Sequence, residues 1–510
     1  MKFAWIFFIF IFLNGCGSDS PSRVVNTQKE NLTIVENQYY TLEPYLIDTS
    51  YDSFKWVQVC GVPVLNNQDE NSLSIDFLAP ESDKDQKYCF EFTGHKGNDT
   101  YVKSYDVTVV APTVEVYIDH ASLPTLQQLM HMVEEHDKDD TTKRFVSWER
   151  VKLSETAQDI LNAKFFNIVN NNISTQFIDA IVNYAKNKNR VNVKLFSNTA
   201  VSITNLSPII KALKSSANAT ISKINLYDDG SFEYMDLYSW KESDSKIELL
   251  DRDSILLKSY LDGESDVRPQ AMSARYNWHR IYNVNYNFLR KDYLDVEPKL
   301  NDFREYLGDS LTQMQWDQFS KMPLYKQKLL LSIVGFDKAK LQSQYDSSSL
   351  PNFVFTGTTT WAGGETREFY AKQQVNVINN AINETSPYYL GRDYDLFFKG
   401  HPRGEDINDY IISSFEDITN IPASVSFELL LMTGMIPDKV AGVASSLYFT
   451  IPADNVDFIV FTSSEDITDR EEALKSPLVQ VMMKLNIVKE DNVLFWSDLP
   501  NCESGVCISH

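Results

Sequence analysis

The chain of 510 residues has no excess of basic residues, and this absence limits the partners that it can have. Lysine and arginine together number 47, against 70 aspartates and glutamates, and the formal net charge is −23 at pH 7. Nucleic acids and anionic membrane surfaces both require a basic footprint on their partner, so neither is expected as the main ligand. An anionic small substrate is not excluded, because it needs only a local positive site.

Long apolar runs are also lacking, apart from one run from Phe3 to Leu13. This run falls short of the roughly 20 residues that a membrane-spanning helix needs, and it is typical of a secretory signal. The Leu-x-Gly-Cys that ends at Cys16 resembles a bacterial lipoprotein box. We therefore expect a signal peptide over residues 1–16, lipidation of Cys16, and a linker over 17–24. The protein is then expected in the bacterial cell envelope, held at the membrane only by this lipid anchor. The alternative is a plain signal peptide that is cut nearby.

Cysteine is scarce, and no Cys-x-x-Cys is present. Besides Cys16 the chain has four cysteines in two natural pairs, Cys60 with Cys89 and Cys502 with Cys507. Export makes disulfides possible, and no histidine lies at ligand spacing beside these cysteines. The pattern favours two disulfides over a metal site.

Residues 25–111 carry short runs in which apolar and polar residues alternate, with turn residues between the runs. These runs occupy 54–60, 72–77, 88–92 and 105–110. The pattern predicts an all-β sandwich, and the set of Trp56, Cys60 and Cys89 is loosely immunoglobulin-like. A plain structural domain is favoured over a spacer or a module that contacts carbohydrate.

Strands and helices alternate after residue 112. Strands are expected over 114–120, 191–196, 221–227, 352–357, 394–398, 440–444 and 458–461, and helices over 123–130, 177–188, 206–214, 374–382 and 427–433. A mainly helical segment over about 245–350 lies between the two groups. This rhythm predicts two α/β domains with parallel, doubly wound sheets. Their expected bounds are 112–345, with a return of residues 490–510, and 346–489.

Residues that can carry chemistry follow the carboxyl ends of several predicted strands, where open α/β sheets bind ligands. Asp228 and Asp229 follow one strand, and a carboxylate there could accept a proton from an attacking hydroxyl. The alternative is a pair of aspartates that only caps a turn. This pair does not have the Asp-x-Asp spacing of metal-dependent sugar transferases, so no metal is expected at it.

Further candidates lie in the second predicted domain. His401, in Lys399-Gly400-His401-Pro402, could exchange a proton near neutral pH. Ser445 and Ser446 could begin a helix and seat a phosphate. Gly357 to Trp361 suits a substrate loop, and Glu428 could bind ribose hydroxyls. The alternatives are a satisfied loop histidine, an ordinary helix cap, a β-turn with Trp361 in the core, and a carboxylate that only favours the helix dipole.

Three of these motifs, in this order and spacing, resemble the marine-bacterial β-galactoside α-2,6-sialyltransferases of glycosyltransferase family 80. They are Tyr-Asp-Asp-Gly-Ser at 227–231, Phe-Lys-Gly-His-Pro at 398–402 and Ala-Ser-Ser-Leu at 444–447. The resemblance implies a GT-B fold, which consists of two facing Rossmann-like domains, and an immunoglobulin-like sandwich that precedes it in the chain. It also implies inverting transfer of N-acetylneuraminic acid from CMP-sialic acid to a galactose hydroxyl, without metal or other cofactor. The implied acceptors are galactose-terminated glycans such as lactose or N-acetyllactosamine.

The resemblance also implies roles for single residues. Asp229 rather than Asp228 matches the family's catalytic aspartate, and His401 matches its catalytic histidine. In the implied mechanism, Asp229 takes the proton of the acceptor hydroxyl, while protonated His401 and two serines stabilise the departing phosphate. Trp361 matches the acceptor-side closing loop. The residues that match the binding site of the CMP donor are Gly357, Thr358, Lys399, Gly400, Glu428, Ser445 and Ser446.

Two positions depart from the pattern of the relatives. Glu405 stands where many of them have glycine, and Val201 follows Asn198-Thr199-Ala200 where some carry a histidine. The second departure leaves the linkage open between α-2,6 and α-2,3. Outside this class, a sugar-binding surface lipoprotein without catalysis remains the alternative, and such a protein needs no acid–base pair.

Overall fold

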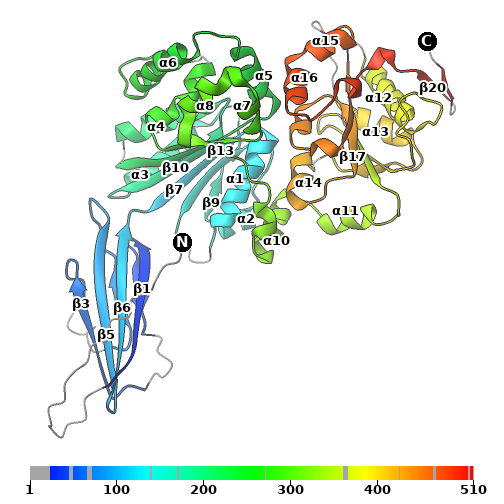
Figure 1. Cartoon of the computed structure of the whole chain (residues 1–510). Coiled ribbons are helices and arrows are strands. Elements are labelled where there is room, and N and C mark those ends of the chain that lie inside the picture. Colours follow the sequence, from blue (N-terminus) through cyan, green and yellow to red (C-terminus); the bar gives the residue numbers. More distant parts are fainter. Residues whose placement is uncertain are drawn as a thin grey trace, which may run out of the picture. The chain divides into compact units, whose positions relative to one another are not determined.

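The computed structural model forms two compact units, Met1–Pro112 and Thr113–His510, and each is described by itself (Figure 1). The residues described are 23–44, 50–65, 72–137, 141–168, 172–216, 218–269, 272–359, 366–423, 425–462, 467–503 and 506–508. The predicted signal peptide and Cys16 lie outside these residues. Within them, no helix has both the length and the apolar character needed to cross a membrane.

The first unit packs two antiparallel-rich sheets around one aromatic core. One sheet has the order β1-β6-β5-β3, and the other pairs β2 with β4. Trp56, Phe90 and Phe92 of the first sheet and Phe77 of the second are buried in the same cluster. The bounds are β1 Arg23–Val35, β2 Tyr39–Leu42, β3 Ser53–Cys60, β4 Ile75–Leu78, β5 Gln86–Lys96 and β6 Asp99–Val110. A disulfide between Cys60 and Cys89 joins β3 to β5, as the spacing suggested.

The strand β1 was not predicted. It pairs in parallel with β6 at the edge of its sheet. Its residues from Gln28 to Asn31 are polar and exposed, as is common for an edge strand that faces solvent. A polar run of this kind lacks the alternation from which strands are recognised.

The second unit begins with a parallel sheet in the order β13-β12-β11-β10-β7-β8-β9, which we call the first lobe together with helices α1 to α10. Its strands are β7 Thr113–Asp119, β8 Lys143–Trp148, β9 Ala163–Phe165, β10 Val191–Asn198, β11 Ala219–Tyr227, β12 Val284–Phe288 and β13 Leu311–Gln313. Its helices are α1 Ser122–Glu135, α2 Glu155–Ile160, α3 Thr175–Lys186, α4 Ser202–Ser216, α5 Ser231–Trp240, α6 Lys246–Leu261, α7 Asp292–Val296, α8 Asn301–Leu307, α9 Gln318–Lys321 and α10 Leu324–Val334. Helices on both faces bury the central strands, which explains their nearly continuous apolar runs.

A second parallel sheet, in the order β16-β15-β14-β17-β18-β19, forms the second lobe with helices α11 to α16 (Figure 1). Its strands are β14 Asn352–Thr356, β15 Asp395–Lys399, β16 Thr419–Ile421, β17 Lys439–Val443, β18 Val456–Phe461 and β19 Val493–Phe495. Its helices are α11 Lys338–Tyr345, α12 Arg367–Ile382, α13 Glu405–Ser413, α14 Phe427–Thr433, α15 Arg470–Lys475 and α16 Pro477–Lys484. Two doubly wound sheets in one unit are the GT-B arrangement that the sequence predicted.

The segment predicted as mainly helical, 245–350, also supplies two strands of the first sheet. β12 pairs with β11, and β13 pairs with β12. β12 alternates buried and half-buried residues over only five positions. Such a short run between many aromatic residues is not distinguishable from a buried helix by its period.

The predicted return of residues 490–510 to the first lobe is wrong. β19 pairs with β18 inside the second sheet, where Val493, Leu494 and Phe495 are all buried. The hairpin of β20 (Asn501–Glu503) and β21 (Val506–Ile508) lies on α12. α16 packs on the first lobe, where it contacts α5 and α7, and α14 contacts α1 and α9.

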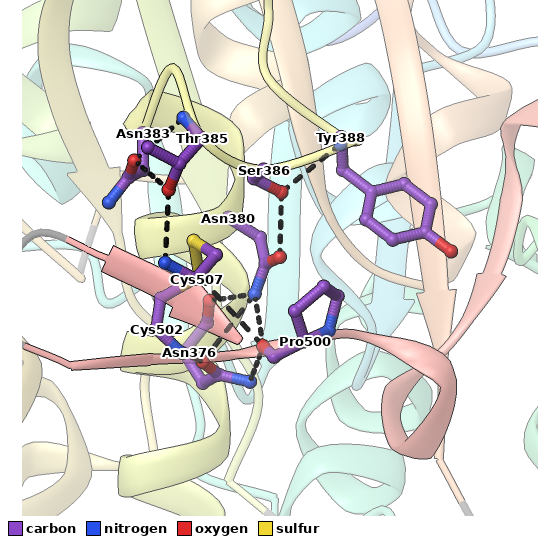
Figure 2. Close-up of a disulfide and its surroundings, with 9 residues drawn as sticks. All are labelled: Asn376, Asn380, Asn383, Thr385, Ser386, Tyr388, Pro500, Cys502 and Cys507. Atoms are coloured by element: carbon purple, nitrogen blue, oxygen red, sulfur yellow. Dashed lines mark hydrogen bonds between the residues drawn. A yellow bond between two sulfur atoms is a disulfide. The ribbon is translucent and has the colours of Figure 1, made fainter. Parts of the chain in front are cut away.

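Polar contacts fasten this carboxy-terminal hairpin to α12 (Figure 2). Asn376 and Asn380 donate to the carbonyl of Pro500 over 3.1 and 2.8 Å, and the N–H of Cys502 donates to Asn376 Oδ1 over 2.9 Å. The second expected disulfide, between Cys502 and Cys507, closes the hairpin. The amide side chains of α12 therefore hold this hairpin on the second lobe.

Candidate active site

Polar residues gather at the carboxyl ends of the parallel strands in both lobes. In the first lobe, β11 ends at Tyr227, and Asp228 and Asp229 follow it directly. Gly230 then turns the chain into α5 with a φ of 81°, a conformation that favours glycine. In the second lobe, β15 ends at Lys399, which the remaining members of the Lys-Gly-His-Pro motif follow.

The two neighbouring aspartates have different surroundings. Asp228 is buried and accepts hydrogen bonds from the backbone N–H groups of Gly230 and Leu289 and from the hydroxyl of Tyr234. Burial raises the pKa of Asp228 to about 7, although these donors oppose the rise. Because its oxygens are engaged inside the lobe, Asp228 holds the turn together and is not available to a substrate.

Asp229 is only partly buried and faces a different set of groups. Burial raises the pKa of Asp229, while hydrogen bonding by Asn198 and the charges of His120 and Arg275 lower it. A carboxylate that is accessible and has a raised pKa is a better proton acceptor than an ordinary surface aspartate. Asp229 thus has the exposure and basicity that a general base needs.

The second lobe approaches this carboxylate through the loop after β17. A Cβ built on Gly230 would lie 3.5 Å from Cβ of Ser446. Behind this contact, the rings of Tyr234 and Phe449 stack with their centroids 5.1 Å apart. The residue after Asp229 therefore lies against the second lobe's serine pair, which places groups from both lobes in one site.

The serine pair begins a short helix, as the sequence suggested. Ser445 caps a 3-10 helix over Ser446–Phe449, and its Oγ accepts from the N–H of Leu447 over 3.4 Å. Ser446 is exposed beside Gly230. Hydroxyl and backbone donors at a turn of this kind suit an anion, so the loop can contact a phosphate.

His401 follows Gly400 and is partly buried. Its Nδ1 accepts a hydrogen bond of 3.2 Å from the N–H of Arg403, so the neutral ring carries its proton on Nε2. Burial lowers the pKa of His401, and the charges of Lys399, Arg403 and Arg150 lower it further. Without an anion beside it, the lowered pKa favours the neutral ring, which offers its Nε2–H as a donor. Protonation of His401 beside the departing phosphate stays a prediction.

The main chain around His401 is held by Asn408 of α13. Its Nδ2 donates to the carbonyl of His401 over 3.0 Å. A Cβ on Gly400 would come within 2.2 Å of Asn408 Oδ1, so only glycine permits this close approach. Asn408 could not be recognised from the sequence, because its partner is seven residues away across a loop.

Lys399 is almost fully buried, with 7% of its surface exposed. Its ammonium group donates to the carbonyls of Gly400 and Ala423 over 2.8 and 3.1 Å. Burial lowers the pKa of Lys399 to about 8, while the nearby Glu428 opposes the change. A cation of this kind loses its charge just above neutral pH.

Glu428 lies in the first turn of α14, close enough to Lys399 for each to shift the pKa of the other. Burial raises the pKa of Glu428, and hydrogen bonding within the first turn and the Lys399 charge lower it. Ser426 caps this helix, with its Oγ accepting from the N–H of Leu429 over 3.3 Å. Two of the predicted donor-binding residues, Lys399 and Glu428, are thus neighbours in the fold.

The loop after β14 is held by α12. The N–H of Thr358 donates to Gln374 Oε1 over 2.9 Å, and Gln374 Nε2 donates back to the carbonyl of Thr358 over 3.1 Å. Gly357 donates its N–H to the carbonyl of Lys399 over 3.0 Å, which links this loop to β15. Trp361 lies outside the described residues.

Arg150 and Arg403 also lie near His401, and neither was selected from the sequence. Arg150 is close enough to His401 to lower its pKa. Arg403 reaches across to the first lobe, where its guanidinium lies 3.7 Å from a carboxylate oxygen of Glu149. Glu149 and Arg150 directly follow β8, so they share the strand-end position of the predicted candidates, but a single charged pair after a strand is too common to stand out.

Glu405 and Val201, which depart from the pattern of the relatives, each lie at the start of a helix. Glu405 is exposed and is the first residue of α13, where a carboxylate favours the helix dipole. Val201 is partly buried just before α4. Across the described ranges, no group of three or more histidines, cysteines, aspartates and glutamates is placed to hold a metal ion.

A comparison with models of protein families matches residues 114–491 to the family described as Sialyltransferase PMO188. The match covers well over half of the chain. A comparison with curated proteins gave no match.

Solved structures give closer relatives. A sialyltransferase from Photobacterium damsela is 57% identical with a TM-score of 0.90, over 92% of this chain and 100% of that one. The 2,6-sialyltransferase of Vibrionaceae Photobacterium sp. JT-ISH-224, in a ternary complex with CMP and lactose, is 52% identical with a TM-score of 0.82, over 95% and 99%. The α/β-galactoside α-2,3-sialyltransferase of Photobacterium phosphoreum is 30% identical with a TM-score of 0.66, over 76% and 99%.

Proposed function

The chain belongs to the sialyltransferase PMO188 family, and we propose that it transfers N-acetylneuraminic acid from CMP-sialic acid to a galactose hydroxyl in α-2,6 linkage. The observation that carries this proposal is the joint site of two lobes, with Asp229 beside Gly230 and Gly230 against Ser446. One lobe supplies a base for the acceptor, and the other supplies groups for a nucleotide phosphate.

The choice of linkage rests on similarity. The relative described as a 2,6-sialyltransferase is 52% identical to this chain, whereas the relative described as an α-2,3-sialyltransferase is 30% identical. The first was captured with CMP as donor product and lactose as acceptor. These ligands support CMP-sialic acid and galactose-terminated glycans as the substrates of the present chain.

Asp229 acts as the general base. As the galactose hydroxyl attacks the anomeric carbon of the sialyl group, the bond from that carbon to the CMP oxygen breaks on the opposite face. The configuration at the anomeric carbon is thereby inverted. The hydroxyl proton passes to Asp229, which loses it to water afterwards. Because both substrates are held between the lobes, their orientation lowers the barrier further.

His401 and the serine pair stabilise the leaving group. The CMP phosphate gains negative charge as it departs, and donors aimed at that charge lower the barrier. His401 offers Nε2–H because its Nδ1 is already an acceptor. The anion raises the pKa of this ring again, so that the imidazole can also pass its proton to the phosphate.

The remaining donor contacts belong to the second lobe. Lys399, Gly400 and Glu428 are the groups for the cytidine and its ribose, and Gly357 and Thr358 line the same edge. Trp361 is assigned to the acceptor from the motif alone. No metal or other cofactor is part of this proposal.

One assay with a product analysis tests the function. Purified protein incubated with CMP-sialic acid and lactose is expected to release CMP and form sialyl-lactose, and NMR of the product is expected to show the α-2,6 linkage. An α-2,3 product would overturn the linkage, and CMP release that does not depend on lactose would overturn transferase activity.

We also propose that the protein is exported and anchored by a lipid on Cys16. The support is the apolar run followed by Leu-x-Gly-Cys. Metabolic labelling with a fatty acid is expected to label the full chain in a bacterial host. The Cys16→Ala variant is expected to lose the label, and retention of the label there would overturn the anchor.

A further inference from the structure

Asn198 occupies a central place at the edge of the first sheet. It is the last residue of β10, which lies between β7 and β11. Its Cα pairs with that of Tyr227, two residues before Asp229, and Ser197 pairs with Ile118, next to Asp119. The polar ends of three adjacent strands therefore place the Asn198 amide between two carboxylates.

The orientation of the Asn198 amide is fixed by its oxygen, and its Nδ2 donor is not used in that contact. The side chain is fully buried, and its Oδ1 accepts a hydrogen bond of 2.8 Å from the N–H of Ala200. This bond sets which end of the amide is the donor. Its Nδ2 is buried and meets no acceptor of the described residues at full hydrogen-bond geometry, but it lies close enough to Asp119 and Asp229 to lower the pKa of both carboxyl groups. A buried donor without a well-formed hydrogen bond costs free energy, so such a group is expected to have a use.

Asp119 also interacts with Asn198, but it already has three other donors. Its Oδ1 accepts from the N–H groups of His120 and Ala121 over 2.7 and 2.8 Å, and its Oδ2 accepts from Gln128 Nε2 over 3.0 Å. Asp119 is fully buried, and these bonds hold it in place. The other neighbour, Asp229, is the carboxylate with unfilled acceptor positions.

We propose that Asn198 is a positioning residue for Asp229, whose Nδ2 donates to one carboxylate oxygen and leaves the other oxygen turned toward the acceptor hydroxyl. This inference rests on the proposed function, in which Asp229 is the base. The proton of the hydroxyl goes to the free oxygen, and Asn198 keeps its own protons throughout. An aspartate held in this way loses less entropy when the acceptor arrives.

Several charged groups act on Asp229 together with Asn198. His120 after β7 and Arg275 in the 3-10 helix Met272–Tyr276 lower the pKa of Asp229. Asp119, Asp228 and Glu233 are carboxylates whose own pKa values respond to the charge of Asp229. A hydrogen bond to the ionised carboxylate adds to the lowering, so loss of the amide is expected to raise the pKa of Asp229.

Two variants separate positioning from folding. Asn198→Ala removes both ends of the amide. Asn198→Ser keeps a hydroxyl that can accept from the N–H of Ala200 but is too short to replace Nδ2, so it preserves the turn. Asn205→Ala is the matched control, because Asn205 is also buried and donates to Ser197 Oγ over 3.5 Å without contacting Asp229.

The first readout is kinetic. Both Asn198 variants are expected to lower kcat for lactose by roughly 10- to 100-fold, the size of effect seen when a supporting hydrogen bond to a site residue is removed. KM for the CMP donor is expected to stay unchanged, and the acid limb of the kcat/KM profile is expected to move to higher pH. The Asn205→Ala control is expected to shift neither.

The second readout needs no activity. The carboxyl carbon of Asp229 is followed by NMR in protein labelled with ¹³C at aspartate, and its signal is assigned by its loss in Asp229→Asn. Its titration is expected to move to higher pH in Asn198→Ser. An unchanged titration would overturn the inference whatever the enzyme does. A shifted titration in a protein that transfers no sialic acid would instead overturn the proposed function and leave the contact established.

Discussion

Gly230 of the first lobe lies against Ser446 of the second, so close that a Cβ on Gly230 would stand 3.5 Å from that of Ser446. The contact joins the residue after the candidate base to the candidate phosphate site. It is made possible by a residue without a side chain and with a φ of 81°. The backbone turn at Gly230 therefore brings the candidate base of the first lobe next to the candidate phosphate site of the second.

Gly230→Ala is expected to weaken both stability and catalysis. The left-handed conformation costs a residue with a Cβ about 1–2 kcal/mol in the free energy of unfolding. The new methyl also meets Ser446, so KM for the CMP donor is expected to rise. Gly263→Ala is the matched control, because Gly263 has a similar φ of 77° but nothing within 4 Å of a Cβ. A chemical denaturation series and donor kinetics check both effects. Equal kinetics in the two variants would show that the contact with Ser446 does not matter.

Asp228 and Asp229 are expected to respond differently to removal of their charge. Asp229→Ala is expected to lower kcat by ~10²–10⁴ with little change in thermal stability, as for loss of a general base. Asp228→Asn is expected to lower the melting temperature, because Tyr234, Gly230 and Leu289 all donate to this carboxylate. Kinetics and calorimetry on the same preparations give the comparison. Near-normal turnover in Asp229→Ala would remove it as the base.

Donor binding is expected to weaken as the pH rises through about 8. The pKa of Lys399 is lowered to about 8 by burial, so its ammonium is charged below that pH and neutral above it. A neutral amine no longer attracts the anionic donor, and KM for CMP-sialic acid is expected to increase above pH 8. In Lys399→Met, KM is expected to be high at all pH values. A wild-type KM that stays flat from pH 7 to 9 would contradict the role.

The disulfide between Cys502 and Cys507 is expected to stabilise the second lobe rather than catalyse. The loop it closes is short, with a sequence separation of 5, which corresponds to about 2 kcal/mol in the chain-entropy model. Replacing both cysteines with serine is expected to lower the free energy of unfolding by up to this amount and to leave kcat unchanged. The hairpin is still held on α12 by Asn376 and Asn380 (Figure 2).

The pair of Cys60 and Cys89 provides the control for this experiment. It lies in the first unit, so its replacement with serine is expected to leave unfolding of the second unit unchanged. Denaturation followed by tryptophan fluorescence, with and without reductant, distinguishes the pairs. A loss of kcat on reduction that only the Cys502 and Cys507 variant reproduces would assign the hairpin a role in catalysis.

Much of the fold follows from local pattern. The continuous apolar runs that became β7, β10, β14 and β15 were recognisable, because parallel strands buried on both faces contain few polar residues. The polar edge strand β1 and the short strands β12 and β13 were not recognisable from the sequence. They are strands because they pair with neighbouring strands, and their own residues show no strand pattern. The return of residues 490–510 was misplaced, because which lobe a short apolar strand joins is decided by its neighbours and not by its sequence.

The sequence by itself determined which residue types stand after which strands. From this order, Asp228 and Asp229 of the first lobe and Lys399 and His401 of the second lobe were candidates. Only the tertiary structure decided between the two aspartates, because hydrogen bonds from residues up to 61 positions away occupy Asp228. It also showed that burial and nearby cations lower the pKa of His401. Asn198 and Asn408 were not recognised in the sequence either, because the groups that they lie against, Asp229 and the main chain of His401, belong to other segments of the fold.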